Sequence, residues 1–81
     1  MTIKDALRAE VLGRVVEVVI LARGTDEQKV LNAFVDSRLL LLKDAGIVQW
    51  YSNKYDRFVV MPQHGWQPAE LLIEVKRQLD L

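Results

Sequence analysis

The sequence predicts an α+β fold in which a helical domain carries a β-hairpin. Three observations support this prediction. Apolar residues recur at helical spacing between Asp26 and Ala45. Two runs rich in β-branched and aromatic residues then flank a polar turn, as in a β-hairpin. Pro68 begins a last segment with the apolar spacing of an amphipathic helix. A chain of 81 residues holds one core, so we expect a single domain over residues 1–81. The predicted order of elements is α-α(-α)-β-β-α.

A long first helix is expected to begin near Ile3. Thr2 and Asp5 are placed like the partners of a capping box, in which two side chains satisfy the free backbone N–H groups at a helix start. This helix would continue to Ala22 and end at Gly24, because glycine is favoured just after the last helical turn.

The segment before Ala22 also fits a different structure. Glu10, Arg14 and Glu17 form a charged stripe at helical spacing, which favours the long helix. The segment is nevertheless rich in β-branched valine, and Gly13 could end the helix before it. The alternative fold is therefore an α-β-α-β-β-α arrangement with Arg14–Leu21 as a strand.

The next helical region covers Asp26–Ala45. Thr25 and Gln28 match a capping box at its start, and Gly46 ends the apolar pattern. The Asp36-Ser37 pair could divide the region into two short helices. The residues at helical spacing are Val30, Leu31, Phe34, Val35, Leu39, Leu42 and Ala45.

A β-hairpin is expected over Ile47–Met61. Its runs IVQWYS and RFVVM flank a polar turn at residues 53–56, and pairing Ser52 with Arg57 closes the hairpin. One face would carry Val48, Trp50, Val59 and Met61, and the other Gln49, Tyr51, Phe58 and Val60. Each face holds an aromatic residue, but only one face can meet the core of this domain. We expect Trp50 to be largely buried.

The predicted helices carry more apolar residues than one small core can hide. Hydrophobic residues make up 51% of the chain, and the last helix, from Pro68, adds a stripe of Leu72, Val75 and Leu79. We therefore expect a homodimer that associates through the first or the last helix.

Composition limits the environment and the partners. Eleven basic residues balance eleven acidic ones, so no overall field attracts nucleic acid or an anionic membrane. The chain contains no cysteine, and its longest apolar runs, Val18–Ala22 and Leu39–Leu42, are too short to cross a bilayer. The first ten residues include two acids before any apolar run, unlike a secretory signal. These features predict a cytoplasmic protein without membrane contact.

No pattern in the sequence predicts catalysis. The single histidine, His64, lies in a loop without a second histidine at helical spacing, so no metal site is expected. Ser37 and Ser52 lie in no nucleophile motif, and no glycine-rich loop precedes a helix to hold a phosphate. We expect a non-enzymatic protein without a cofactor.

Residues 35–60 resemble the second half of winged-helix DNA-binding domains. In that family a recognition helix with a leucine pair is followed by an Ala-Gly-hydrophobic turn and a hairpin called the wing. The matching residues here are Val35, Leu39, Leu42, Ala45, Gly46, Ile47 and Val48. The resemblance implies a transcriptional regulator that binds DNA through the helix and the wing. The residues it places at the DNA are Arg38, Lys54, Tyr55 and Arg57.

A small protein–protein interaction module is the alternative function. An adaptor, an inhibitor or an assembly factor, for example from a phage or another mobile element, would fit the neutral charge and the aromatic residues beside arginines. The distribution of charge distinguishes the two hypotheses. Convergence of Arg38, Lys54 and Arg57 on one face would favour DNA, and acids interspersed among them would favour a protein.

Overall fold

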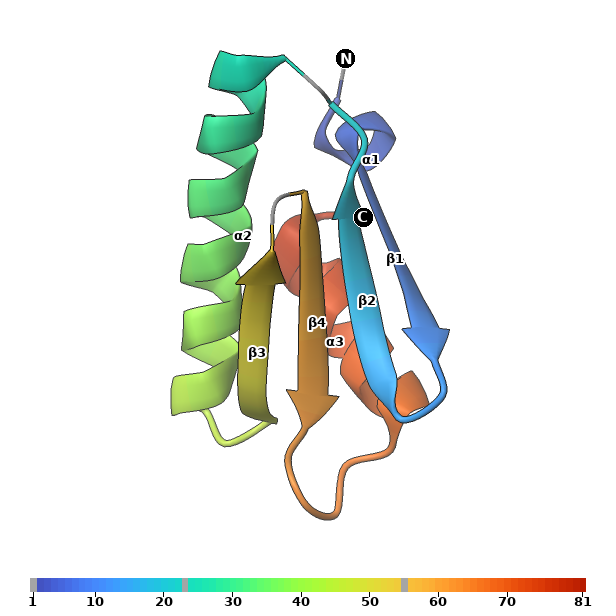
Figure 1. Ribbon diagram of the computed structural model, residues 1–81. Coiled ribbons are helices and arrows are strands. Elements are labelled where there is room, and N and C mark those ends of the chain that lie inside the picture. Colours follow the sequence, from blue (N-terminus) through green and yellow to red (C-terminus); the bar gives the residue numbers. More distant parts are fainter. Residues whose placement is uncertain (1, 23, 55) are drawn as a thin grey trace.

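Two β-hairpins form one sheet, with helices before, between and after them (Figure 1). The computed structural model describes residues 2–22, 24–54 and 56–81. The α+β class is confirmed, and the four antiparallel strands have the order β1-β2-β4-β3. The elements in chain order are α1 (Ile3–Ala6), β1 (Leu7–Leu12), β2 (Val15–Ile20), α2 (Thr25–Asp44), β3 (Val48–Lys54), β4 (Arg57–Pro62) and α3 (Pro68–Leu79).

The predicted long first helix is wrong. Thr2 does begin a helix, because its hydroxyl accepts a hydrogen bond from the Asp5 backbone N–H, but α1 lasts for a single turn. The chain then forms β1, turns at Gly13 and returns as β2. Leu12 pairs with Val15, so the loop has two residues, and the glycine adopts a φ of 63° that suits such a tight hairpin. The strand of the alternative fold, expected at Arg14–Leu21, is present as β2, but the expected α-β-α-β-β-α order is incomplete because it lacks β1.

The charged stripe of Glu10, Arg14 and Glu17 led to the wrong prediction of a helix, because Glu10 and Glu17 can equally lie on one face of two paired strands. Glu10 and Glu17 lie directly opposite each other in the β1–β2 ladder, on the face of the sheet that no described helix covers. Glu17 is 7% exposed and would be costly without a partner, but Arg57 of β4 supplies one. Glu17 can therefore lie in a buried strand because Arg57, 40 residues later in the sequence, balances its charge.

Helix α2 is continuous and does not break at Asp36-Ser37. Thr25 is its first residue, and the preceding Gly24 offers no side-chain cap, so the predicted capping box did not form. The predicted end is confirmed. Gly46 has a φ of 78°, and the N–H groups of Gly46 and Ile47 donate to the carbonyls of Lys43 and Leu42, as in a Schellman motif.

The second hairpin is present, but its register and its buried face differ from the prediction. Lys54, not Ser52, pairs with Arg57, so the loop is shorter than expected. Trp50 shares a face with Val59 and Met61, as predicted, but that face is not the buried one, and Trp50 is 41% exposed. An irregularity between Val48 and Trp50 turns Val48 towards the core instead.

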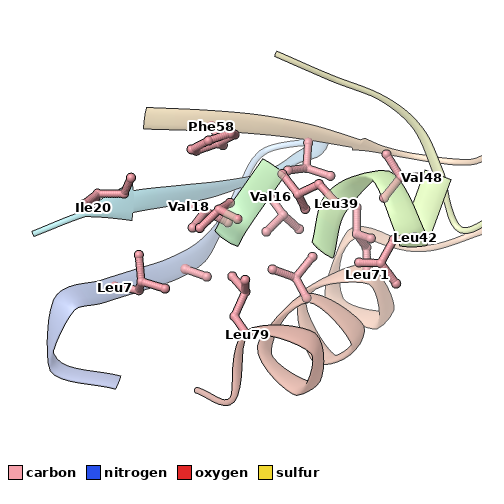
Figure 2. Close-up of a cluster of buried hydrophobic side chains, with 14 of the residues drawn as sticks. Leu7, Val16, Val18, Ile20, Leu39, Leu42, Val48, Phe58, Leu71 and Leu79 are labelled. Carbon is pink, nitrogen blue, oxygen red and sulfur yellow. The ribbon is translucent and has the colours of Figure 1, made fainter. Parts of the chain in front are cut away.

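Both long helices pack on the same face of the sheet. In Figure 2 the side chains of β2 and β4 meet those of α2 and α3 in one apolar cluster. The members with no exposed surface are Val16, Val18, Ile20, Val35, Leu39, Phe58, Val60, Leu71, Val75 and Leu79. Because side chains alternate along a strand, the residues between these members point to the opposite face. None of the described helices covers that face.

Helix α3 begins at Pro68, as predicted, and Glu70 accepts a hydrogen bond from the Gln67 backbone N–H at 3.1 Å. Leu71 supplies the buried position at its start, while Leu72 is only partly buried. Within the described residues, no helix combines the length and the apolar character needed to cross a membrane.

We expect Phe58 and Trp50, which lie on opposite faces of the second hairpin, to differ in their effect on stability. Phe58→Ala should lower the free energy of unfolding by about 3–5 kcal/mol, because the side chain is fully buried and leaves a cavity. Trp50→Ala should lower it by about 1 kcal/mol or less, because that side chain is partly solvated. Urea denaturation followed by circular dichroism measures both values. Equal losses would contradict the assignment of the buried face.

Candidate functional site

The residues predicted to contact nucleic acid do not converge. Lys54 and Arg57 pair across the β3–β4 ladder and share the face that no described helix covers. Arg38 lies on α2, in the other layer, with its guanidinium 5.1 Å from the centre of the Phe34 ring. Tyr55 lies outside the described residues. The structure therefore brings two of the four residues together and separates Arg38 from them.

The side chains on the helix-free face fall into three rows that cross the strands, and we call this face the open face. The apolar row contains Leu12, Val15, Met61 and Trp50. The acidic row contains Glu10, Glu17, Val59 and Ser52, and the basic row contains Arg8, Val19, Arg57 and Lys54. Val15 and Met61 adjoin the Val16–Val60 pair, which places them in one row. Each row includes one residue from each strand.

Arg57 is engaged by an acid of the neighbouring row. Its Nη1 atom lies 2.7 Å from Oε1 of Glu17, close enough for a strong ionic contact although the atoms are not aligned as a hydrogen bond. The Glu17 side chain is 9% exposed and that of Arg57 is 57% exposed. Glu10 lies opposite Glu17, and this pair of like charges makes Arg57 more important to the acid. Arg57 is therefore exposed to solvent and at the same time engaged by Glu17.

The other charges of the open face also alternate in sign. Arg8 Nη2 lies 3.9 Å from Glu10 Oε1, and both side chains are more than half exposed. The open face therefore holds three bases, Arg8, Arg57 and Lys54, with two acids placed between them and the apolar row. This arrangement offers a banded surface, not a continuous basic patch for phosphates.

Most of the open face was missed from the sequence. Arg8, Glu10 and Leu12 were assigned to a helix, although the alternation of LRAEV is also that of a half-buried strand. The sequence around Trp50 does not predict that this residue is exposed, because both faces of its hairpin carry apolar residues. Only the pairing of β4 with β2 decides which of those faces meets the helices.

Hollows open at several places on the surface of the described residues. One, of about 670 Å³, lies between the β1–β2 turn and the loop before α3, where Arg14, His64 and Trp66 line it. Met61 also lines it, so this hollow continues the apolar row. His64 is exposed, and no group of three metal-binding side chains comes together in residues 2–22, 24–54 and 56–81. A smaller hollow of about 370 Å³ lies between α1 and the start of α2.

Tyr51 fixes the hairpin to α2 from the core side. Its hydroxyl donates a hydrogen bond to Asp36 Oδ1 at 3.1 Å. Partial burial raises the pKa of this hydroxyl above the ordinary value of 10.0, and the hydrogen bond to Asp36 and the negative charges of Asp36 and Asp44 raise it further. The contact ties the middle of β3 to α2 on the side of the sheet opposite the open face.

No family model, curated protein or solved structure matches this chain.

We expect Arg57→Ala to destabilise the protein, unlike Lys54→Ala. Loss of Arg57 leaves the carboxylate of Glu17 nearly buried beside Glu10, and the free energy of unfolding should fall by about 1–2 kcal/mol after allowance for the solvation of Arg57. Lys54→Ala should change it by less than about 0.5 kcal/mol. Equal effects of the two substitutions in urea denaturation would show that the Glu17–Arg57 contact does not support the fold.

We expect the contribution of Tyr51 to stability to depend on pH. Because its folded pKa is raised, the contribution is complete below about pH 10, the ordinary pKa of a tyrosine, and is lost as the pH rises through the folded pKa. At neutral pH, Tyr51→Phe should lower the free energy of unfolding by about 0.5–1.5 kcal/mol. Denaturation of both proteins between pH 7 and pH 11 should show this difference shrinking; a constant difference would contradict the shift.

Proposed function

We propose that this protein is a non-enzymatic interaction module that binds a protein through the open face of its sheet. The observation that carries the proposal is the placement of Glu10 and Glu17 between the bases and the apolar row. A phosphate backbone gains from uninterrupted positive charge, whereas a protein surface can match alternating signs. This is the charge distribution expected of a protein-binding surface.

The apolar row supports the same function. Trp50 and Leu12 are 41% and 47% exposed, and Met61 is partly buried between them and the hollow near His64. Tryptophan, methionine and arginine are enriched in protein interfaces, and a tryptophan at such a site often contributes much of the binding energy. We propose that Trp50 is the main apolar contact and that the charged rows set the orientation of the partner.

Nucleic-acid binding is the second candidate. Lys54 and Arg57 lie side by side on the open face with Arg8 in the same row, and an exposed Trp50 could stack on an unpaired base. The winged-helix resemblance would add Arg38 and Tyr55 to that surface. Arg38 lies in the other layer, and Arg57 is engaged by Glu17, so the geometry supports this candidate less.

Photocrosslinking in cells tests the proposed function. A photoreactive amino acid replaces Leu12 on the open face or, as a matched control, Ile73 on α3; both positions are exposed apolar residues. We expect the Leu12 position to give a discrete protein adduct that mass spectrometry identifies, and the Ile73 position to give none. The adduct should disappear when Trp50→Ala is added, because the apolar row then loses its largest side chain.

Each other outcome of this experiment contradicts the proposal. An adduct that nuclease treatment removes would establish the second candidate in its place. Equal adducts at the two positions, or an adduct that persists with Trp50→Ala, would show that the open face is not the binding surface. As a control, circular dichroism of each variant checks that the variant is folded.

A further inference from the structure

We infer that a second copy of this chain pairs with the outer edge of β1, so that two sheets join into one continuous sheet across a two-fold axis. This inference goes beyond the proposed function, because it concerns the edge of the sheet and not its open face. β1 is the first strand in the order β1-β2-β4-β3, so only one of its edges is paired. In Figure 1 α2 runs along the border formed by β3, whereas β1 forms the opposite border.

The hydrogen bonds of the first hairpin show which backbone groups of β1 are free. The two-residue loop between Leu12 and Val15 makes this pair a hydrogen-bonded one, and bonded and non-bonded pairs alternate from there along the ladder. The Leu21 backbone N–H donates to the carbonyl of Ala6 at 2.7 Å, which agrees with this alternation. The backbone groups of the even-numbered residues of β1 therefore point to β2. The residues whose N–H and C=O groups point to the outer edge are Leu7, Ala9 and Val11.

The outer edge of β1 is open and unprotected. Its backbone groups have no hydrogen-bond partner among the described residues. A hollow of about 350 Å³ opens beside them, between β1 and the side chains of Lys4 and Lys76. Edge strands that stay unpaired are commonly protected by a proline, a β-bulge or a lysine. β1 has none of these over its six residues, so its edge can accept another strand.

Charge selects how two copies of β1 pair. Two-fold symmetry makes the pairing antiparallel, and because outer residues must pair with outer residues, the axis passes through one residue that faces itself. An axis through Arg8 sets two arginines opposite each other, and an axis through Glu10 sets two glutamates opposite each other. An axis through Ala9 sets Arg8 opposite Glu10 of the second copy, and the symmetry repeats this contact with the copies exchanged. An axis nearer either end of β1 pairs fewer residues.

The Ala9 register suits both faces of the strand. Arg8 and Glu10 of the second copy form a non-hydrogen-bonded pair, in which Cα atoms lie about 4.5 Å apart and opposite charges stabilise the ladder. Within one copy Arg8 Nη2 and Glu10 Oε1 are 3.9 Å apart, a long contact that leaves both groups free to meet a second partner. On the helix side Leu7 lies opposite Val11 of the second copy, which covers a valine that is only partly buried in one copy.

The dimer expected from the sequence is retained in this proposal with a different interface. The interface moves from a helix to an edge strand within the segment that was expected to form the first helix. Antiparallel pairing about this axis keeps the open faces of both copies on the same side of the joined sheet. The surface that we propose to bind a protein is thereby continuous across the axis.

A charge-exchange experiment tests this dimer. Arg8→Glu sets acids opposite acids across the axis, and Glu10→Arg sets bases opposite bases, so each variant alone should dimerise at least about tenfold more weakly than the parent protein. An equimolar mixture of the two variants sets opposite charges at both symmetry-related positions, and we expect it to form a heterodimer of near-parental affinity. Sedimentation equilibrium at micromolar concentrations measures each dissociation constant.

A proline substitution tests the backbone pairing itself. Ala9→Pro removes an N–H group that bonds to no described residue of the same chain, and its ring obstructs the approach of a second strand. We expect this variant to stay folded by circular dichroism and to dimerise at least about tenfold more weakly than the parent. Arg8→Gln removes one of the paired charges without adding repulsion and should also weaken the dimer, which keeps the test valid if Ala9→Pro or Arg8→Glu does not fold.

Two controls separate the edge from other surfaces. Arg77→Glu and Glu74→Arg change the net charge by the same amounts on α3, where Arg77 Nη1 lies 3.0 Å from Glu74 Oε1, and neither variant nor their mixture should alter the dimer. Trp50→Ala changes the open face on β3, at the far border of the sheet, and should leave the dissociation constant of the dimer unchanged.

Three results would overturn the inference. These are a parent protein that is monomeric throughout the concentration range, an Ala9→Pro variant that is folded and dimerises like the parent, and a dimer that Trp50→Ala weakens as much as the charge reversals do. The proposed function can fail or hold separately. In its crosslinking test, an adduct of two copies of this chain reports the edge, and only an adduct with a different protein bears on the open face.

Discussion

The antiparallel pairing of β2 with β4 is the constraint on which the rest of the structure depends. It joins two hairpins that are each too small to be stable alone into one sheet, and it places Val16 beside Val60 and Val18 beside Phe58. These pairs form the centre of the apolar face on which α2 and α3 pack. Without this pairing, neither hairpin would have a face that the helices could bury.

The same pairing creates the chemistry of the opposite face. It brings Arg57 within 2.7 Å of Glu17, whose directly opposite neighbour in its own hairpin is a second acid, Glu10. An acid at the centre of the sheet is thereby made compatible with a strand. The ionic contact with Glu17 also partly neutralises Arg57, which a nucleic-acid phosphate would otherwise contact. The same contact therefore stabilises the sheet and favours a protein partner over nucleic acid in our proposal.

Part of the apolar excess of the sequence is exposed on the open face, and part is exposed on the helices, where Leu40 and Leu41 of α2 and Ile73 of α3 are accessible. The long first helix would have required a partner along its length, but that segment is a hairpin whose inner residues fill the core. What remains uncovered on the sheet is a band containing Leu12 and Trp50, together with charged rows. A surface of this kind gains from a partner of complementary shape and charge.

The sequence by itself determined the features that depend on neighbouring residues. Turn chemistry and the spacing of apolar residues predict that α2 ends just before Gly46, that α3 starts at Pro68 and that a hairpin follows α2. Lys54 and Arg57 could also be placed near each other, because the strands of a hairpin must pair. The tertiary structure decided which face of that hairpin is buried, the partner of Glu17 and the strand that contains Arg8. Those outcomes depend on the pairing of β2 with β4, two strands that α2 and β3 separate in the sequence. The stability gained from such a long-range pairing cannot be inferred from a short segment of the sequence.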